Sequence, residues 1–311
     1  MPAPGALPRH ASSQYVFYLQ PLGYRTRPGE LPEFGVFSGS LGKDPPAFFG
    51  KAQGMEPGET QRISILTGMF AVFKKEFSSF FSSPVGYLVM GIFLVITGLF
   101  LWVFRGPFNI IDYGFADLSL FFLLAPWAFL LLIPAVCMRS FAEERKLGTL
   151  ELLLSRPVST GRLVLGKFLG VCALIGVTLL PTLLYVLAVH QLGATAGNLD
   201  TGLVWGSYAG LLLLMGLYAA IGLFASSLTE NQIAAFMLAV AGCFLFYQGF
   251  DSLATLFPDG GTALFIRELG IRAHYEAIGQ GIVDSRDLLY FISLGVFFLF
   301  LTTRRLNAYR Q

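Results

Sequence analysis

Charged residues are scarce in this chain of 311 residues: Asp, Glu, Lys and Arg make up 13%, and the net charge is +2. With 55% hydrophobic residues, the composition is too apolar for an ordinary soluble domain. The small net charge gives no reason to expect a nucleic-acid partner. No acidic or basic residue stands at mid-depth in the long apolar runs. A carrier driven by protons or ions usually needs one there, so that class of transporter is disfavoured.

Cysteine and histidine are also rare, with three of each. Cys137, Cys172 and Cys243 lie inside apolar runs, and no C-x-x-C pair occurs, so neither a disulfide framework nor a metal site is indicated. The histidines are His10, His190 and His274. They are too scattered for us to expect a carboxylate–histidine set to converge, which argues against an intramembrane hydrolase.

Apolar runs of about 20 residues recur along the chain and predict an all-α, polytopic integral membrane protein. Six transmembrane helices are predicted, at about 86–104, 119–138, 164–190, 203–225, 232–250 and 287–303. The last is the weakest of these predictions, because its apolar centre, 288–301, has only 14 residues.

The first 68 residues have a different composition, with nine of the 16 prolines and ten of the 35 glycines. This density predicts a disordered extension over 1–68, ahead of a membrane domain over 69–311. The extension lacks the apolar region of a signal peptide. One hypothesis is that Met69 or Met55 begins the native protein.

An amphipathic helix over 70–81 is predicted to lie in the membrane interface before the first span. Its apolar face would pack into the bilayer surface, and its lysines would point toward anionic headgroups. The side chains concerned are Phe70, Phe73, Phe77 and Phe80 on the apolar face, and Lys74 and Lys75. The alternative is that this segment is simply the start of the first span.

The stretch 138–170, between the second and third spans, carries nine charges. At about 3 kcal/mol per charged side chain at the bilayer centre, it must lie outside the membrane core. Within it, 149–154 predicts a short helix with an apolar face, ended by Pro157. The side chains on that face are Leu150, Leu153 and Leu154. A helix of this kind, held between two spans, predicts a protein partner on that side of the membrane.

The distribution of Lys and Arg predicts the orientation. Placing both termini and the 138–170 stretch in the cytoplasm leaves eleven basic residues of 69–311 inside and four outside. The longest outer piece is then 251–286, in which apolar and charged residues alternate irregularly. One or two interfacial helices forming an external gate, or a simple packed cap over the spans, both fit this segment.

The run from Gly161 to Lys167 looks like most of a phosphate-binding loop, but Phe168 follows where Mg²⁺ coordination needs Ser or Thr. The run also leads directly into a membrane span and follows no strand. We therefore expect the chain to have no nucleotide site, not to be an enzyme, and to bind no cofactor.

Together, the six spans, the preceding amphipathic helix and the charged stretch resemble the permease subunits of ABC-2 type transporters. The matching residues are Glu143, Glu144, Arg145, Gly148-Thr149-Leu150-Glu151, Pro157-Val158 and Gly166-Lys167. A narrower similarity, to the gliding-motility-associated permeases within that family, rests on 73–89, 115–170 and 273–294.

This resemblance implies a half-transporter in the cytoplasmic (inner) membrane, paired with a second permease, alike or different. Separate cytoplasmic ABC ATPase subunits would use ATP and Mg²⁺ and dock on the short helix, which would act as a coupling helix. The residues that the resemblance assigns to ATPase coupling are Glu143, Glu144, Arg145, Gly148, Thr149, Leu150, Glu151, Leu153 and Leu154.

Two alternatives stay open. The same scaffold in relatives serves polysaccharide export, lipid export or copper-enzyme maturation, so the substrate is not given by the sequence. The other alternative is a protein of a different functional class, either a non-transport membrane scaffold or an intramembrane hydrolase. The missing histidine–acid set argues against the hydrolase, and the partner-seeking charged stretch argues against an inert scaffold.

Overall fold

The computed structural model describes residues 57–115, 117–154, 159–193, 199–281 and 284–309. Within these ranges the chain is helical and contains no strand, which confirms the all-α prediction. The helices are α1 (Pro57–Ser82), α2 (Pro84–Gly98), α3 (Ile110–Tyr113), α4 (Ser119–Lys146), α5 (Thr149–Leu154), α6 (Thr160–Leu179), α7 (Leu183–Leu192), α8 (Thr201–Leu228), α9 (Gln232–Phe244), α10 (Phe250–Ala254), α11 (Gly260–Glu268), α12 (Ile271–Gly279) and α13 (Ser285–Asn307). The π-helical turn η1 (Leu99–Val103) ends the first span. A second π-helical turn, η3 (Leu245–Gly249), and a 3₁₀ turn, η2 (Leu180–Thr182), connect helices within single spans.

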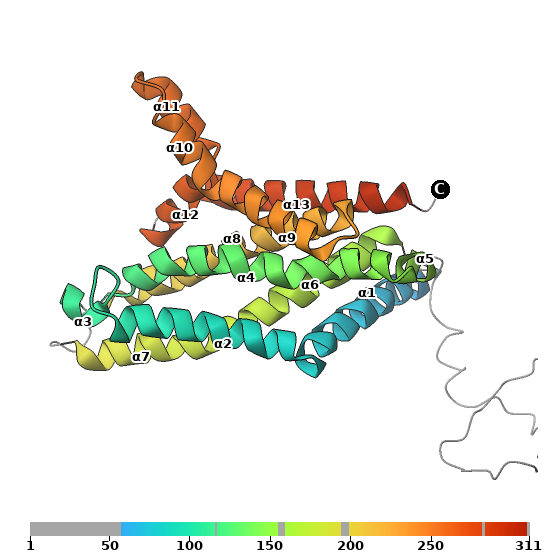
Figure 1. Cartoon of the computed structure of the whole chain (residues 1–311), viewed down its shortest axis with the longest axis horizontal. Coiled ribbons are helices and arrows are strands. Elements are labelled where there is room, and N and C mark those ends of the chain that lie inside the picture. Colours follow the sequence, from blue (N-terminus) through green and yellow to red (C-terminus); the bar gives the residue numbers. More distant parts are fainter. Residues whose placement is uncertain (1–56, 116, 155–158, 194–198, 282–283, 310–311) are drawn as a thin grey trace, which may run out of the picture. The chain divides into compact units, whose positions relative to one another are not determined.

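Six helical segments are long and apolar enough to cross a membrane, as predicted. They are Pro84–Val103, Ser119–Lys146, Thr160–Leu192, Thr201–Leu228, Gln232–Ala254 and Ser285–Asn307. Two of them, α4 and α8, form the centre: 67% and 72% of their most apolar windows are buried, against 22–33% in the other four. Figure 1 shows these two helices side by side, with the others around them.

Small residues and hydrogen bonds join α4 to α8. A Cβ atom at Gly222 would come within 2.7 Å of the Cys137 Cβ atom, so only glycine permits this approach. Ser226 accepts the backbone N–H of Phe141 at 3.1 Å and donates to the Met138 carbonyl at 3.1 Å. Lipid tails are as apolar as leucine, so close packing and such interhelical hydrogen bonds, rather than hydrophobicity, hold the two helices together.

A proline inside α4 creates the contact that fixes α12. Pro126 has no N–H, so the carbonyl of Phe122 loses its helical donor. The hydroxyl of Tyr275 in α12 donates to that carbonyl at 2.7 Å. An orphaned carbonyl is costly in a bilayer, and this bond satisfies it.

The segment predicted as external helices therefore divides into two kinds. In α12, Ile271, Tyr275 and Ile278 are at most 4% exposed and pack into the bundle, as in the packed-cap alternative. In α11, Leu264 and Phe265 are more than 60% exposed, as in an interfacial helix.

Several boundaries differ from the sequence-based expectation. The second span does not end near 138 but continues as one α-helix to Lys146, because its charged end finds partners on neighbouring helices. The last span is a full helix of 23 residues that includes its flanking polar residues. At the N-terminal side, α1 begins at Pro57, before the predicted boundary at Met69, and proline suits a first helical turn. The rest of the extension predicted over 1–68 lies outside the described residues.

Candidate functional site

The turn between α4 and α5 lies at the end of the bundle, well beyond the apolar part of α4 (Figure 1). Gly148 has a φ of +68°, the left-handed conformation that ends helices and favours glycine. Its N–H donates to the Arg145 carbonyl at 3.0 Å. The Thr149 hydroxyl donates to the Glu144 carbonyl at 3.2 Å. These bonds join the start of α5 to the end of α4, and the two helices form the α4–α5 hairpin.

The sequence suggested that the apolar face of α5 points away from the protein toward a partner. In the structure this face is turned toward the bundle. Leu150 is only 4% exposed and belongs to the hydrophobic core, and the half-buried Leu153 packs against that core. The side chain of Leu154 lies outside the described residues. The surface left for a partner is instead the turn itself, where Leu147 is 66% exposed and Thr149 and Glu151 are also exposed. Leu147 was not among the residues expected from the sequence, although an apolar residue directly before a turn glycine could have indicated it.

A buried lysine lies behind this turn. Lys167 of α6 is 2% exposed, and its ammonium nitrogen lies 2.8 Å from Glu76 Oε1 of α1 and 2.9 Å from Glu144 Oε1 of α4. It also lies 5.2 Å from the centre of the Phe141 ring, a cation–π distance. We call Lys167, Glu76 and Glu144 the charge triad. The charge triad joins α1, α4 and α6 at one point. Its lysine belongs to the run from Gly161 to Lys167 that resembles a phosphate-binding loop, and this run lies in α6 and not in a loop.

Two glycines of α6 allow the triad to form. A Cβ atom at Gly166 would come within 2.7 Å of the Val72 side chain, and one at Gly170 within 2.9 Å of the Glu76 Cβ atom. The helices α1 and α6 therefore touch closely along a Gly-x-x-x-Gly face. Without this approach, the Glu76 carboxylate could not reach Lys167.

The charges of the triad interact strongly because the three side chains are largely buried away from water. The side chains of Glu76 and Glu144 are 14% and 16% exposed, and the Glu144 Oε2 atom has no partner among the described residues. Two carboxylates face one ammonium, so the lysine offsets one of two negative charges that would otherwise repel each other. Removing one partner of a buried ion pair typically costs about 3–5 kcal/mol.

Arg145 makes a second connection at the same end. Its guanidinium donates to the Ser227 carbonyl at 3.1 Å and to Glu230 Oε1 at 3.0 Å, and it lies 4.6 Å from the centre of the Tyr309 ring. It thus links α4 to the α8–α9 turn and to the end of α13. Glu143 differs, because its pair with Arg139 is 3.9 Å long and about half exposed, which gives it little energetic weight.

The side chains of the predicted interfacial helix lie on two faces of α1. Ring centroids of Phe70, Phe73 and Phe77 follow one another at 5.8 and 5.9 Å, and the row continues to Phe81 at 4.9 Å. Phe80 and Phe81 both pack against the hydrophobic core of the bundle. Lys74 and Lys75 are exposed, as a headgroup-facing role requires.

One histidine does meet a carboxylate, contrary to the sequence-based expectation. His274 Nδ1 lies 2.6 Å from Asp287 Oδ1, and the ring stacks on Tyr290 with a centroid distance of 4.1 Å. Its other nitrogen lies 2.8 Å from the Glu268 carbonyl oxygen. Both ring nitrogens are therefore engaged in structural contacts, which leaves neither available as a base toward a substrate. Within the described residues, no group of His, Cys, Asp and Glu could hold a metal ion.

Comparison with known proteins supplies a family. Residues 107–260 match the family model described as ABC-2 family transporter protein, a range from the segment before α3 to the start of α11 that includes the α4–α5 turn. The comparison with curated proteins gave no match. Proteins of this family are membrane components of ABC transporters and associate with an ABC ATPase. Residues 107–260, slightly under half of the chain, accordingly match an ABC-2 family transporter domain, and the chain is a multi-pass membrane protein.

Proposed function

We propose that this protein is the membrane-spanning permease subunit of an ATP-driven export complex, in which a separate ATPase subunit supplies the work. The observation that carries the proposal is the continuity of α4. It begins in the membrane, forms the centre of the bundle with α8, and ends at the exposed Leu147 turn. A force applied to that turn acts directly on one of the two most buried spans.

The charge triad and Arg145 extend that mechanical connection. Through Lys167, a displacement of the α4–α5 hairpin acts on α6 and on α1. Through Arg145, it acts on the α8–α9 turn. The ATPase can change the permease only by contacting its two conformations differently, so these rigid connections determine which helices follow the hairpin.

The orientation in this proposal follows from the basic residues. Both termini and the α4–α5 turn lie in the cytoplasm, and the subunit resides in the inner membrane. The chain binds no cofactor of its own, since ATP and Mg²⁺ belong to the ATPase. A second permease, identical or different, completes the translocation path.

The narrower proposal is an export complex of the gliding-motility-associated type. It rests on the similarity of 73–89, 115–170 and 273–294 to the permeases of that type. A related exporter for polysaccharide, lipid or copper-enzyme maturation would share the fold and the α4–α5 turn. Mass spectrometry of the complex purified in mild detergent separates these possibilities, because the associated ATPase and second permease differ.

A charge at the exposed turn tests the docking proposal. Leu147→Asp should leave the fold intact, because the side chain is 66% exposed, but should abolish co-purification of the ATPase. Leu192→Asp is the matched control, since Leu192 is 67% exposed at the opposite end of a span and should leave the complex unchanged. If Leu147→Asp retains the ATPase with normal turnover, the docking surface lies elsewhere.

A further inference from the structure

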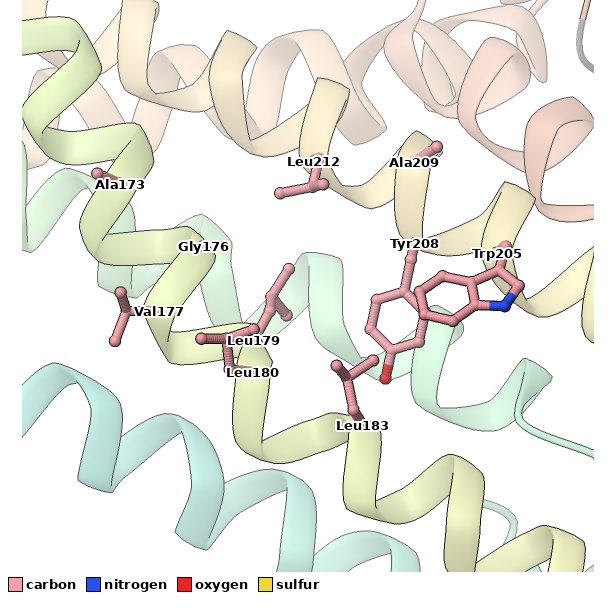
Figure 2. Close-up of a pocket in the computed structure, with 10 residues that line it drawn as sticks. All are labelled: Ala173, Gly176, Val177, Leu179, Leu180, Leu183, Trp205, Tyr208, Ala209 and Leu212. Atoms are coloured by element: carbon pink, nitrogen blue, oxygen red, sulfur yellow. The ribbon is translucent and has the colours of Figure 1, made fainter.

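An apolar groove runs between the third and fourth spans, outside the α4–α5 turn and the charge triad. It has a volume of about 540 Å³. One wall is formed by α6, η2 and the start of α7, and the other by the first turns of α8 (Figure 2). Figure 2 also shows the rings of Trp205 and Tyr208 together at one end, while Ala173 and Leu212 lie toward the other.

A break in the third span opens this groove. Pro181 cannot continue the α-helical hydrogen bonding, and the chain makes the 3₁₀ turn η2. Beyond the turn, α7 leans on the first span: the Tyr185 hydroxyl lies 3.3 Å from Thr97 Oγ1, and its ring lies 6.1 Å from the Trp102 ring. The helix α7 thus departs from α8, and the space between them becomes the groove.

Apart from the indole N–H of Trp205 at one end, the side chains that line the groove offer hydrocarbon contacts. Its one buried hydroxyl, from Tyr208, is already bonded to Thr182 Oγ1 at 3.0 Å, and Thr182 in turn donates to the Leu179 carbonyl at 2.7 Å. No charged side chain belongs to its described lining. Water is held in cavities by polar partners, and a polar ligand needs them too, so neither suits this space.

The open side of the groove continues the surface that faces the bilayer. Leu180 and Trp205 are each 61% exposed at its rim, and Leu212 is 49% exposed. These residues lie within helices that span the membrane, so their exposed atoms meet lipid and not water. Trp205 stands in the second turn of α8, near the end of the span, where tryptophan commonly marks the headgroup level.

We propose that this groove binds one acyl chain of a membrane phospholipid. The chain enters beside Trp205, with its headgroup outside the groove, and extends along α6 and α8 past Gly176 toward Leu212. A second cavity of about 310 Å³, between α6, α8 and α13, shares Leu212 with the groove. The occupied groove supports the bent third span against α8. This site is independent of the identity of the transported substrate.

Gly176 provides a variant that fills the groove. An added Cβ atom there meets no atom within 4 Å, so Gly176→Phe places its ring in the open space. Gly91 of α2 is the matched control, because an added Cβ atom also meets nothing within 4 Å but that glycine lies on an exposed face away from the groove. Ala209→Phe, from the opposite wall, is a second variant if Gly176→Phe does not fold.

The test uses the full chain in dodecyl maltoside, titrated with a phosphatidylethanolamine that carries a photoreactive diazirine on one acyl chain. We expect saturable labelling confined to peptides covering 173–183 and 205–212. Gly176→Phe or Ala209→Phe should lose most of it, and Gly91→Phe should retain it. Labelling that does not saturate, spreads evenly over exposed helices or survives both groove variants overturns the proposal.

A parallel arm uses a diazirine-labelled free fatty acid. Labelling of the same peptides by both probes supports an acyl-chain site that phospholipid occupies. Labelling by the fatty acid alone contradicts a phospholipid ligand. Cross-linking of the groove to a second copy of the chain, in place of lipid, also contradicts it.

Discussion

Replacing Lys167 by methionine should destabilise the protein more than any exposed charge change. Methionine retains most of the length of the side chain, so little space is lost, but the ammonium that faces Glu76 and Glu144 at 2.8 and 2.9 Å disappears. Two carboxylates then share a site from which water is largely excluded. We expect a loss of about 3–5 kcal/mol, the usual result of leaving a buried charge without its partner.

Unfolding in mixed micelles of dodecyl maltoside and SDS, followed by circular dichroism, measures this loss. Arg139→Met is the matched control, because it removes a cation whose pair with Glu143 is 3.9 Å long and about half exposed. Its effect should stay below about 1 kcal/mol.

The reasoning also predicts a rescue. Adding Glu76→Gln and Glu144→Gln to Lys167→Met removes the uncompensated charges, and the triple variant should recover most of the lost stability. The charge argument is refuted if Lys167→Met unfolds like Arg139→Met, or if the triple variant is no more stable than the single one.

Two further predictions use the same unfolding assay. Gly170→Ala should lower the free energy of unfolding by about 1–3 kcal/mol, because the added Cβ atom would approach α1 within 2.9 Å. Gly161→Ala, whose added Cβ atom has its nearest neighbour at 4.0 Å, should be neutral or slightly stabilising. Equal effects of the two substitutions would contradict the close packing of α1 on α6. Tyr275→Phe should lower the free energy of unfolding by about 1 kcal/mol, because it leaves the Phe122 carbonyl without a donor. Tyr113→Phe, at an exposed site, should leave the stability unchanged. If Tyr275→Phe also leaves it unchanged, another group satisfies that carbonyl.

The transmembrane architecture could be predicted from the sequence because the bilayer imposes a simple rule. Runs of apolar residues long enough to cross it are visible without tertiary information. Their ends were less predictable. The charges at the end of α4 suggested a loop, yet Glu144 and Arg145 continue the helix because α6 and the α8–α9 turn supply partners for them.

The short helix between the second and third spans was predicted in position, but its contacts were not. The spacing of Leu150 and Leu153 correctly indicated one apolar face of a short helix, but periodicity alone does not tell which neighbour that face contacts. In the structure it packs on the bundle, and the exposed Leu147 takes the outward position. The charge triad was not predictable, because Glu76, Glu144 and Lys167 come from three separate helices and meet only through tertiary packing.

Site-specific cross-linking at the α4–α5 turn tests the central claim most directly. A photoreactive benzoylphenylalanine placed at position 147 in cells should capture the ABC ATPase subunit, and the same group at position 192 should not. Capture of the ATPase from position 192 but not from position 147, or ATP hydrolysis by the purified chain alone, would contradict the account.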